Sequence, residues 1–278
     1  MKLHRNPLLL RSYALMPQRL IGSALARLTR LEHPQPAVQA VIRHWIKRGQ
    51  IDMAEAIQSN FNNLDAFFLR DLRPTARPIG AGLVSPVDGV VVACGQISAD
   101  LNLWIKGKPT SLPRLFGGKR QQMDLQPYIG GQFLTIFLTP DGYHHVHAPL
   151  AGKLVSVQWI GGRFFPQNQD ALRHIPRIYE RNERATLQLQ DADNQPYLLS
   201  MVAASLVGGI EIAGDVPPDW RNGAVVPLAR KLEKGERLGH FALGSTVVLL
   251  FEPGAVAQLQ LPVGERVKMG QSLQRSMD

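Results

Sequence analysis

Two spacings of apolar residues divide the chain into a helical N-terminal part and a β-rich remainder. Apolar residues recur at helical intervals over 17–31 and again over 38–46, which predicts two amphipathic helices. Asp52 and Glu55 have the N-cap and N3 spacing that begins a third helix, and the pattern over 63–69 predicts a short fourth. The first part of the chain is therefore expected to be helical.

After Val84 the pattern changes to short apolar runs separated by glycine, proline and Asp-Gly turns, which is typical of strands. The strands predicted in this way cover 90–93, 133–138, 154–160, 185–189, 197–207 and 246–251. These elements predict an α+β fold, with a helical region over 1–78 and a β-rich, barrel-like or sandwich-like body over 79–278.

Composition agrees with a globular protein in a reducing compartment. The 278 residues are 45% hydrophobic, which is enough apolar mass for a sizeable core. Cys94 is the single cysteine, so an internal disulfide framework is excluded.

Almost all of the net charge lies at the N-terminus. The chain carries +9 overall, and residues 1–50 account for +8 of it, with nine basic residues and one acid. A generally basic nucleic-acid binder is therefore disfavoured. Basic amphipathic helices favour contact with an anionic membrane, and packing of these helices on the protein's own core is the alternative.

The N-terminus does not have the pattern of a signal peptide. After Lys2 and Arg5 the apolar run is only three leucines long before Arg11 interrupts it. No stretch approaches the roughly 18 consecutive apolar residues of a spanning helix. We therefore expect a peripheral protein on the cytoplasmic side of the cell membrane.

Three turns beside predicted strands carry polar groups that could do chemistry. Asp88 lies in an Asp-Gly turn, His144, His145 and His147 cluster after the strand at 133–138, and Ser245 begins the last strand. Solvated imidazoles with no role are the alternative for the histidines. No metal site is expected, because Cys94 alone cannot supply the further ligands that a zinc ion needs.

The order Asp88, His147, Ser245 also fits a serine hydrolase triad. However, the chain has no Gly-x-Ser-x-Gly nucleophile elbow, and Ser245 precedes a strand instead of lying between a strand and a helix. A non-catalytic lipid-binding β module is a further alternative.

The motifs taken together resemble the phosphatidylserine decarboxylase proenzymes, a pyruvoyl-dependent family of the prokaryotic type. The resemblance covers nearly the whole chain, and its most specific parts are Ser-Pro-x-Asp-Gly at 85–89, Tyr-His-x-x-His-x-Pro at 143–149 and Leu-Gly-Ser-Thr at 243–246. The family usually has an acidic residue directly before the Tyr-His pair. Here Gly142 holds that place and Asp141 lies one residue earlier, so the resemblance assigns Asp141 no role.

The resemblance implies self-cleavage between Gly244 and Ser245, giving a β subunit of residues 1–244 and an α subunit of 245–278. Ser245 would be the nucleophile and then the source of a covalent pyruvoyl group, which is the only cofactor implied. His147 would be the base that activates Ser245, and Asp88 would orient its imidazole.

The mature enzyme implied by the resemblance is a carboxy-lyase of phospholipid biosynthesis. It would convert phosphatidylserine in an anionic membrane to phosphatidylethanolamine and carbon dioxide, with the pyruvoyl group as electron sink. His144 would donate the proton or position the carboxylate. The resemblance also suggests a homodimer, and an ether-linked or soluble phosphoserine compound remains an alternative substrate.

Overall fold

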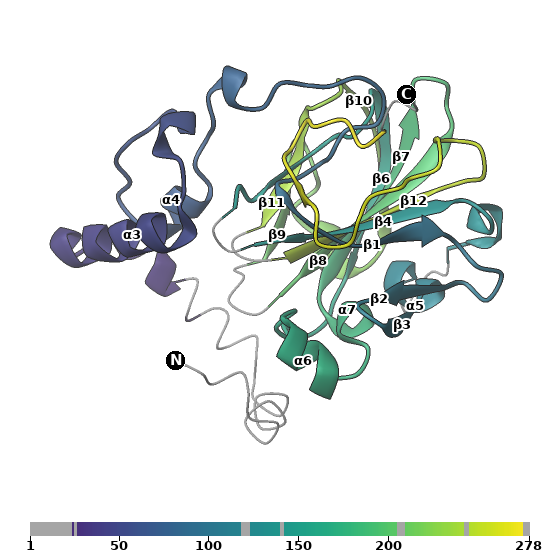
Figure 1. The fold of residues 1–278 in the computed structure, drawn as a ribbon, viewed down its shortest axis with the longest axis horizontal. Helices are drawn as coiled ribbons and strands as arrows, with labels where there is room; N and C mark the ends of the chain where they lie inside the picture. Colours follow the sequence, from purple (N-terminus) through teal and green to yellow (C-terminus); the bar gives the residue numbers. More distant parts are fainter. Residues whose placement is uncertain are drawn as a thin grey trace.

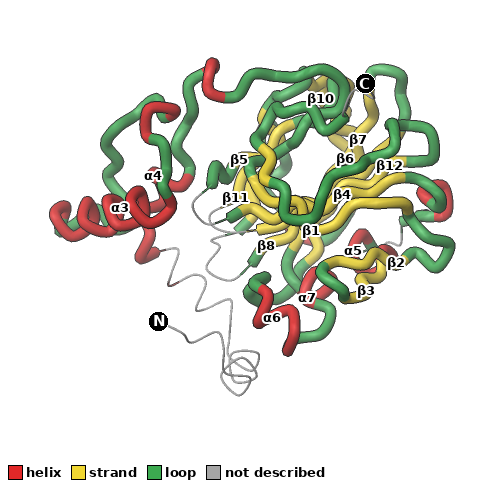
Figure 2. The backbone as a smooth tube through the Cα atoms, viewed as in Figure 1, coloured by secondary structure: helices red, strands yellow, loops and turns green. Residues whose placement is uncertain are grey.

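The computed structural model describes residues 24, 27–117, 123–139, 142–204, 209–241 and 245–274. The longest helix and a second short helix lie to one side of a body built from curved sheets (Figures 1 and 2). The α+β class predicted from the apolar pattern is therefore confirmed. Of the predicted helix at 17–31, residues 24 and 27–31 are described, and 24 and 27–29 are helical; the rest lies outside the described residues.

Two of the predicted N-terminal helices are present. Helix α3, Gln35–Gly49, follows Pro34, and its apolar side buries Ile42. Helix α4, Leu64–Phe68, begins where the Asn63 side chain accepts a hydrogen bond from the Ala66 amide. The two helices pack through an edge-to-face contact of Trp45 and Phe68 at 5.4 Å between ring centroids.

The third predicted helix is wrong in length, because only the single 3-10 turn Met53–Glu55 forms. Asp52 does cap it, accepting a hydrogen bond from the Ala54 amide. Glu55, however, forms ion pairs with Arg77 at 2.9 Å and Lys268 at 3.0 Å instead of capping the turn. The partners are distant in sequence, so the local pattern gave no sign of them.

Eight antiparallel strands form the main sheet, in the order β10-β6-β7-β8-β12-β4-β1-β13. In chain order they are β1 Gly89–Gln96, β4 Gln132–Leu138, β6 Gly152–Ile160, β7 Arg184–Asp191, β8 Pro196–Ala203, β10 Val225–Leu232, β12 Ser245–Phe251 and β13 Arg266–Val267. All six predicted strands are therefore present, although β8 ends earlier than the range 197–207.

Smaller elements complete the body and were not predicted. A second sheet has the order β5-β11-β9, and a hairpin joins β2 to β3. Their bounds are β2 Asn102–Ile105, β3 Lys108–Ser111, β5 His145–His147, β9 Ile210–Ile212 and β11 Arg237–Phe241. Three short helices are also present, namely α5 Leu112–Phe116, α6 Gln169–His174 and α7 Ile178–Arg181.

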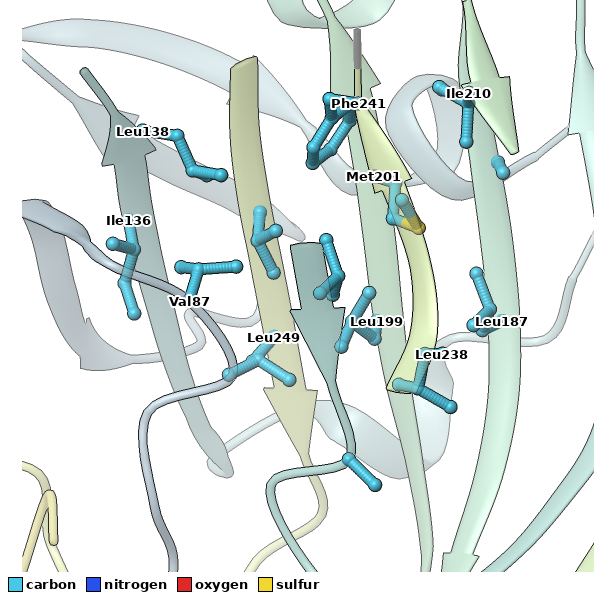
Figure 3. Packing of buried hydrophobic residues seen from close by; sticks show 14 of the residues in the cluster. Val87, Ile136, Leu138, Leu187, Leu199, Met201, Ile210, Leu238, Phe241 and Leu249 are labelled. Carbon is cyan, nitrogen blue, oxygen red and sulfur yellow. The ribbon is translucent and has the colours of Figure 1, made fainter. Parts of the chain in front are cut away.

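The two larger sheets share one apolar core, and Figure 3 shows side chains from both converging on it. Leu249 of β12 and Leu199 of β8 face Leu238 and Phe241 of β11 across this core. The opposite face of the large sheet packs on α5, α6, α7 and the β2–β3 hairpin. Alternate residues of β12 therefore point into two different cores. Among the described helices, none has the length and apolar character needed to cross a bilayer.

Candidate active site

Ser245 is the first residue of β12, which is a central strand of the large sheet. Its backbone pairs with Leu138 of β4 on one side and Ala203 of β8 on the other. The residue is fully buried, on the side of the strand that Val247 and Leu249 share. Gly244 lies outside the described residues, so the structure presents the site from Ser245 onward.

The Ser245 hydroxyl fits conversion to a pyruvoyl group. Its Oγ is buried and has no hydrogen-bond partner among the described residues. A buried hydroxyl without a partner is costly, and nothing in this part of the structure depends on keeping it. Loss of this hydroxyl would therefore remove an unsatisfied polar group instead of breaking an interaction.

The next residue, Thr246, points to the opposite face and is held there. Its Oγ1 donates a hydrogen bond to Gln167 Oε1 at 2.6 Å, and the Gln167 amide nitrogen donates to the Ala203 carbonyl at 3.1 Å. Both side chains are buried. Gln167 thus bridges β8 and β12 beside the Ser245–Ala203 pair and fixes the start of β12.

The three clustered histidines are all buried, at 0% exposure for His144, 4% for His145 and 7% for His147. Solvated imidazoles without a role are therefore excluded. Alternation along the extended segment places the Tyr143 ring against both His145, at a tilt, and His147, which it stacks on, whereas His144 makes an edge-to-face contact with Phe68. The cluster has two faces, one toward Tyr143 and one toward helix α4.

The contacts of His147 determine which ring nitrogen carries the proton. Nδ1 lies 2.7 Å from the Gly235 carbonyl oxygen, which can only accept, so Nδ1 is the donor. Nε2 lies 3.0 Å from Tyr143 Oη and, in the neutral ring, accepts its hydrogen bond. Burial lowers the pKa of His147, against the opposing effect of the Gly235 hydrogen bond. The imidazole is therefore a neutral base with its lone pair on Nε2.

Gly235 is suited to this place by its backbone conformation. Its φ of +82° lies in the left-handed region, and a Cβ there would come within 2.6 Å of Ile79. The turn can therefore present the Gly235 carbonyl to His147 only with a glycine at this position.

Asp88 does not contact the His147 ring, so the expected orienting hydrogen bond is replaced by the one to Gly235. Instead Asp88 accepts from Arg77 Nε at 3.0 Å, Arg77 Nη2 at 2.5 Å and the Met269 amide at 2.7 Å. A fork of two donors from arginine holds a carboxylate in one orientation. Asp88 still acts on His147 through its charge, which raises the pKa of that imidazole.

Strand register brings these groups to one end of the large sheet. Ser245 pairs with Leu138 at the end of β4, and Val90 pairs with Phe137 on the other side of β4. Asp88, directly before β1, and Ser245, on β12, therefore lie on opposite sides of β4, with their main chains about 10 Å apart across two strand spacings. The His147 amide donates to the Pro86 carbonyl at 2.9 Å, which fixes β5 beside the Asp88 turn.

His144 lies next to the chain that leads into Ser245. Its carbonyl accepts a hydrogen bond from the Phe241 amide at 3.0 Å, and Phe241 is the last residue of β11. Asp141 lies outside the described residues, whereas the Gly142 carbonyl accepts a hydrogen bond from Arg70 at 3.4 Å.

The sequence analysis gave no role to four residues that shape this site, namely Tyr143, Arg77, Gln167 and Gly235. Gln167 and Gly235 contact partners far away in sequence, whereas Arg77 lies 11 residues before Asp88 and Tyr143 belongs to the motif at 143–149. No group of three or more metal-ligating side chains occurs in the described segments.

Comparison with known proteins identifies the family. The family model described as phosphatidylserine decarboxylase matches residues 64–275, which is more than half of the chain. A phosphatidylserine decarboxylase proenzyme of Marinobacter nauticus is 35% identical, over 92% of this chain and 93% of that protein. The proenzyme of Bordetella pertussis is also 35% identical, over 97% and 94%, and that of Brevibacillus brevis is 32% identical, over 93% and 94%.

These matches run through both the helical part and the sheets, and they agree with the resemblance carried by the three motifs. The chain therefore belongs to the phosphatidylserine decarboxylase proenzyme family, whose enzymes are lyases of phospholipid biosynthesis with a pyruvoyl group made from a serine.

Proposed function

We propose that this chain cleaves itself between Gly244 and Ser245 and then decarboxylates phosphatidylserine to phosphatidylethanolamine. The observation that carries the assignment is the buried Ser245 hydroxyl at the start of β12, which has no hydrogen-bond partner among the described residues, in a chain of the proenzyme family. The pyruvoyl group supplies the electron sink for loss of carbon dioxide. Ser245 is the residue that would become this group.

Self-cleavage begins with Ser245 Oγ attacking the carbonyl carbon of Gly244. A bond forms between Oγ and that carbon, the Gly244–Ser245 amide bond breaks, and the nitrogen of Ser245 becomes an amine. The hydroxyl proton passes to His147 Nε2, whose lone pair the Gly235 contact makes available. Removal of the Cα proton of residue 245 and cleavage of its Cβ–Oγ bond then release the Gly244 carboxylate and leave dehydroalanine. Water hydrolyses the imine form of this residue, which releases ammonia and leaves the pyruvoyl carbonyl.

Asp88 stabilises the protonated His147 at a distance. The Asp88 carboxylate is held by Arg77 and Met269 and acts on His147 by charge. This differs from a hydrolase triad, in which the acid bonds directly to the imidazole. Tyr143 Oη is hydrogen-bonded to His147 Nε2, the nitrogen that has to accept the Ser245 proton. Tyr143 therefore has to move away or relay that proton when Ser245 reacts.

In turnover His144 is the candidate proton donor or carboxylate-positioning group. It is buried, it packs on Phe68 and its main chain is bonded to Phe241 just before the cleavage site. Its burial would exclude water from the place where a proton has to be delivered.

The cleaved subunits, 1–244 and 245–278, would remain together. Strand β12 pairs along its whole length with β4 and β8, and its apolar side chains lie in both cores. The end of the α subunit also pairs with the segment before β1, for example through the Leu273 amide and the Leu83 carbonyl at 2.9 Å. Separation would expose two buried faces.

The partners follow from the substrate. Phosphatidylserine lies in an anionic membrane, and the basic segment 1–50 would hold the enzyme there, on the cytoplasmic side of the cell membrane. Nucleic acid is not a partner in this proposal. The proposal includes a homodimer, because the resemblance to the family suggests one.

Separate changes at His147 and His144 test the assignment. His147→Ala should leave the chain uncut, because Ser245 loses its base. His144→Ala should still cut the chain, yet release little carbon dioxide from phosphatidylserine. Denaturing gels and assay of carbon dioxide from labelled substrate measure the two steps. Normal turnover by the His144 variant would refute its role.

A serine hydrolase built on Asp88, His147 and Ser245 is the second candidate. It would keep one intact chain and an unmodified Ser245. The buried hydroxyl and the absence of an Asp88–His147 contact favour the decarboxylase.

A further inference from the structure

A pocket of about 340 Å³ lies between the β2–β3 hairpin and the α6–α7 segment, away from Ser245 and the histidines. Its rim carries the exposed side chains of Lys108, Arg173 and Arg177. Its inner wall includes the buried apolar residues Leu172 and Ile178. The pocket thus has a basic rim over an apolar wall.

The positive charges of this rim lack close acidic partners. Lys108 and Arg177 form no ion pair within the described part of the chain, and Arg173 reaches Asp170 only at 4.0 Å. Glu180, the acidic residue of α7, is turned inward and accepts a hydrogen bond from a main-chain amide of β3. An anion from outside the protein would complete this site.

An exposed aromatic side chain adjoins the basic rim. Trp104 is 64% exposed, although its neighbours Leu103 and Ile105 are fully buried. It is paired across the hairpin with Pro109, which lines the pocket. Tryptophan beside basic residues is typical of a surface that contacts the headgroup region of a membrane.

Helix α6, which lines the pocket, is connected by its preceding loop to the start of β12. The helix begins directly after Asn168, which caps it, and the residue before Asn168 is Gln167, which holds Thr246. Figures 1 and 2 show α6 and α7 below β8, with the β2–β3 hairpin beside them. A membrane contact here would therefore lie on the side of the large sheet that Thr246 faces.

We propose that the basic pocket and Trp104 together dock on the headgroups of anionic phospholipids in the bilayer that holds the substrate. The inference rests on the proposed function, since it places a lipid contact beside a site for a lipid substrate. The catalytic body then binds the membrane itself, in addition to the basic N-terminal segment. The phosphate of a headgroup enters the pocket, and Trp104 lies at the level of the headgroups.

Sedimentation with vesicles tests this docking surface in the full chain. The vesicles contain phosphatidylcholine with or without phosphatidylglycerol. The test variant combines three changes in the pocket rim, namely Lys108→Gln, Arg173→Gln and Arg177→Gln. A matched control variant removes three positive charges outside the pocket, on strands β6, β10 and β13, with Lys153→Gln, Lys231→Gln and Arg266→Gln.

The rim variant should bind vesicles that contain phosphatidylglycerol about tenfold more weakly than the control variant. Binding to phosphatidylcholine alone should be the same for both. Equal losses in the two variants, or no loss in either, would overturn the proposal.

Tryptophan fluorescence provides the second measurement. Brominated lipids should quench the wild-type chain, and Trp104→Phe should remove most of that quenching; unchanged quenching would contradict the proposal. Self-cleavage and turnover of short-chain phosphatidylserine dispersed as monomers should stay normal in the rim variant. If the rim variant lost both self-cleavage and turnover, its weaker membrane binding would come from damage to the fold or the catalytic site, and the proposed docking role of the pocket would be overturned.

Discussion

At the scale of single residues, main-chain groups orient the catalytic side chains. The carbonyl of Gly235 fixes the proton on His147 Nδ1, and the amide of Met269 helps to fix Asp88. Met269 belongs to the segment that would become the α subunit, whereas Asp88 and His147 belong to the other. The candidate site would therefore include residues from both products of the proposed cleavage.

Thr246 should stabilise the start of β12 through its hydroxyl alone. Thr246→Val leaves the buried Gln167 Oε1 without its donor, which should lower the free energy of unfolding by about 1–3 kcal/mol. Thr246→Ser keeps the hydroxyl and should cost less. Urea unfolding of both variants in the uncut Ser245→Ala background measures the difference, and equal stabilities would contradict the anchoring role.

Arg77 should position Asp88 for maturation. Arg77→Gln removes the fork of donors and leaves the carboxylate poorly compensated, so self-cleavage should slow by more than about tenfold. Lys268→Gln is the control, because Lys268 contacts Glu55 but not Asp88. The rate of self-cleavage is followed on denaturing gels. An unchanged rate in Arg77→Gln would show that Arg77 does not position Asp88 for self-cleavage.

At the scale of elements, the local pattern of apolar residues predicted the strands whose own residues show their burial. The long apolar runs of β4 and β12 were recognised because both faces of these central strands are buried. Strand β10 was missed because polar residues and Pro227 interrupt it at the edge of the sheet. The contacts of Glu55, Gln167 and His147 join residues far apart in sequence, and only the fold shows them.

Strand β5 should make stability depend on pH. Burial, more than any other factor, lowers the pKa of His145 from 6.5 to about 4, and Arg237 and His240 nearby act in the same direction. The unfolded chain therefore binds a proton that the folded chain excludes. The contribution of neutral His145 to the free energy of unfolding is therefore fully present above about pH 6.5. It is lost as the pH falls toward 4, by up to about 1.4 kcal/mol per pH unit.

Urea unfolding of the uncut Ser245→Ala chain at pH 7 and near pH 5 tests this dependence. His145→Gln should reduce the difference between the two conditions. The exposed His44, changed to glutamine, serves as the control and should leave the difference as it is. If His145→Gln and His44→Gln changed the difference equally, the loss of stability at low pH would not come from His145.

At the scale of the whole molecule, charge and catalysis occupy different parts of the chain. The N-terminal segment carries most of the net charge, and the buried catalytic groups lie in the sheets. Cleavage after position 244 would not separate the sheets, since β12 stays between β4 and β8. Membrane attachment and chemistry can therefore be changed independently.

Removal of residues 1–31 should weaken membrane binding. The loss should be largest at low salt, because screening already weakens the interaction of exposed basic groups with anionic lipid at high salt. Vesicle sedimentation at two salt concentrations measures it. Undiminished binding of the shortened chain would count against a role for this segment.

Self-cleavage at Ser245 is the central claim, and the intact mass of the purified protein under denaturing conditions tests it most directly. The account predicts two chains, 1–244 and 245–278, with a pyruvoyl group at the start of the shorter one, and a single uncut chain for Ser245→Ala. A single unmodified chain from the wild-type protein, or a cut at another bond, would contradict it.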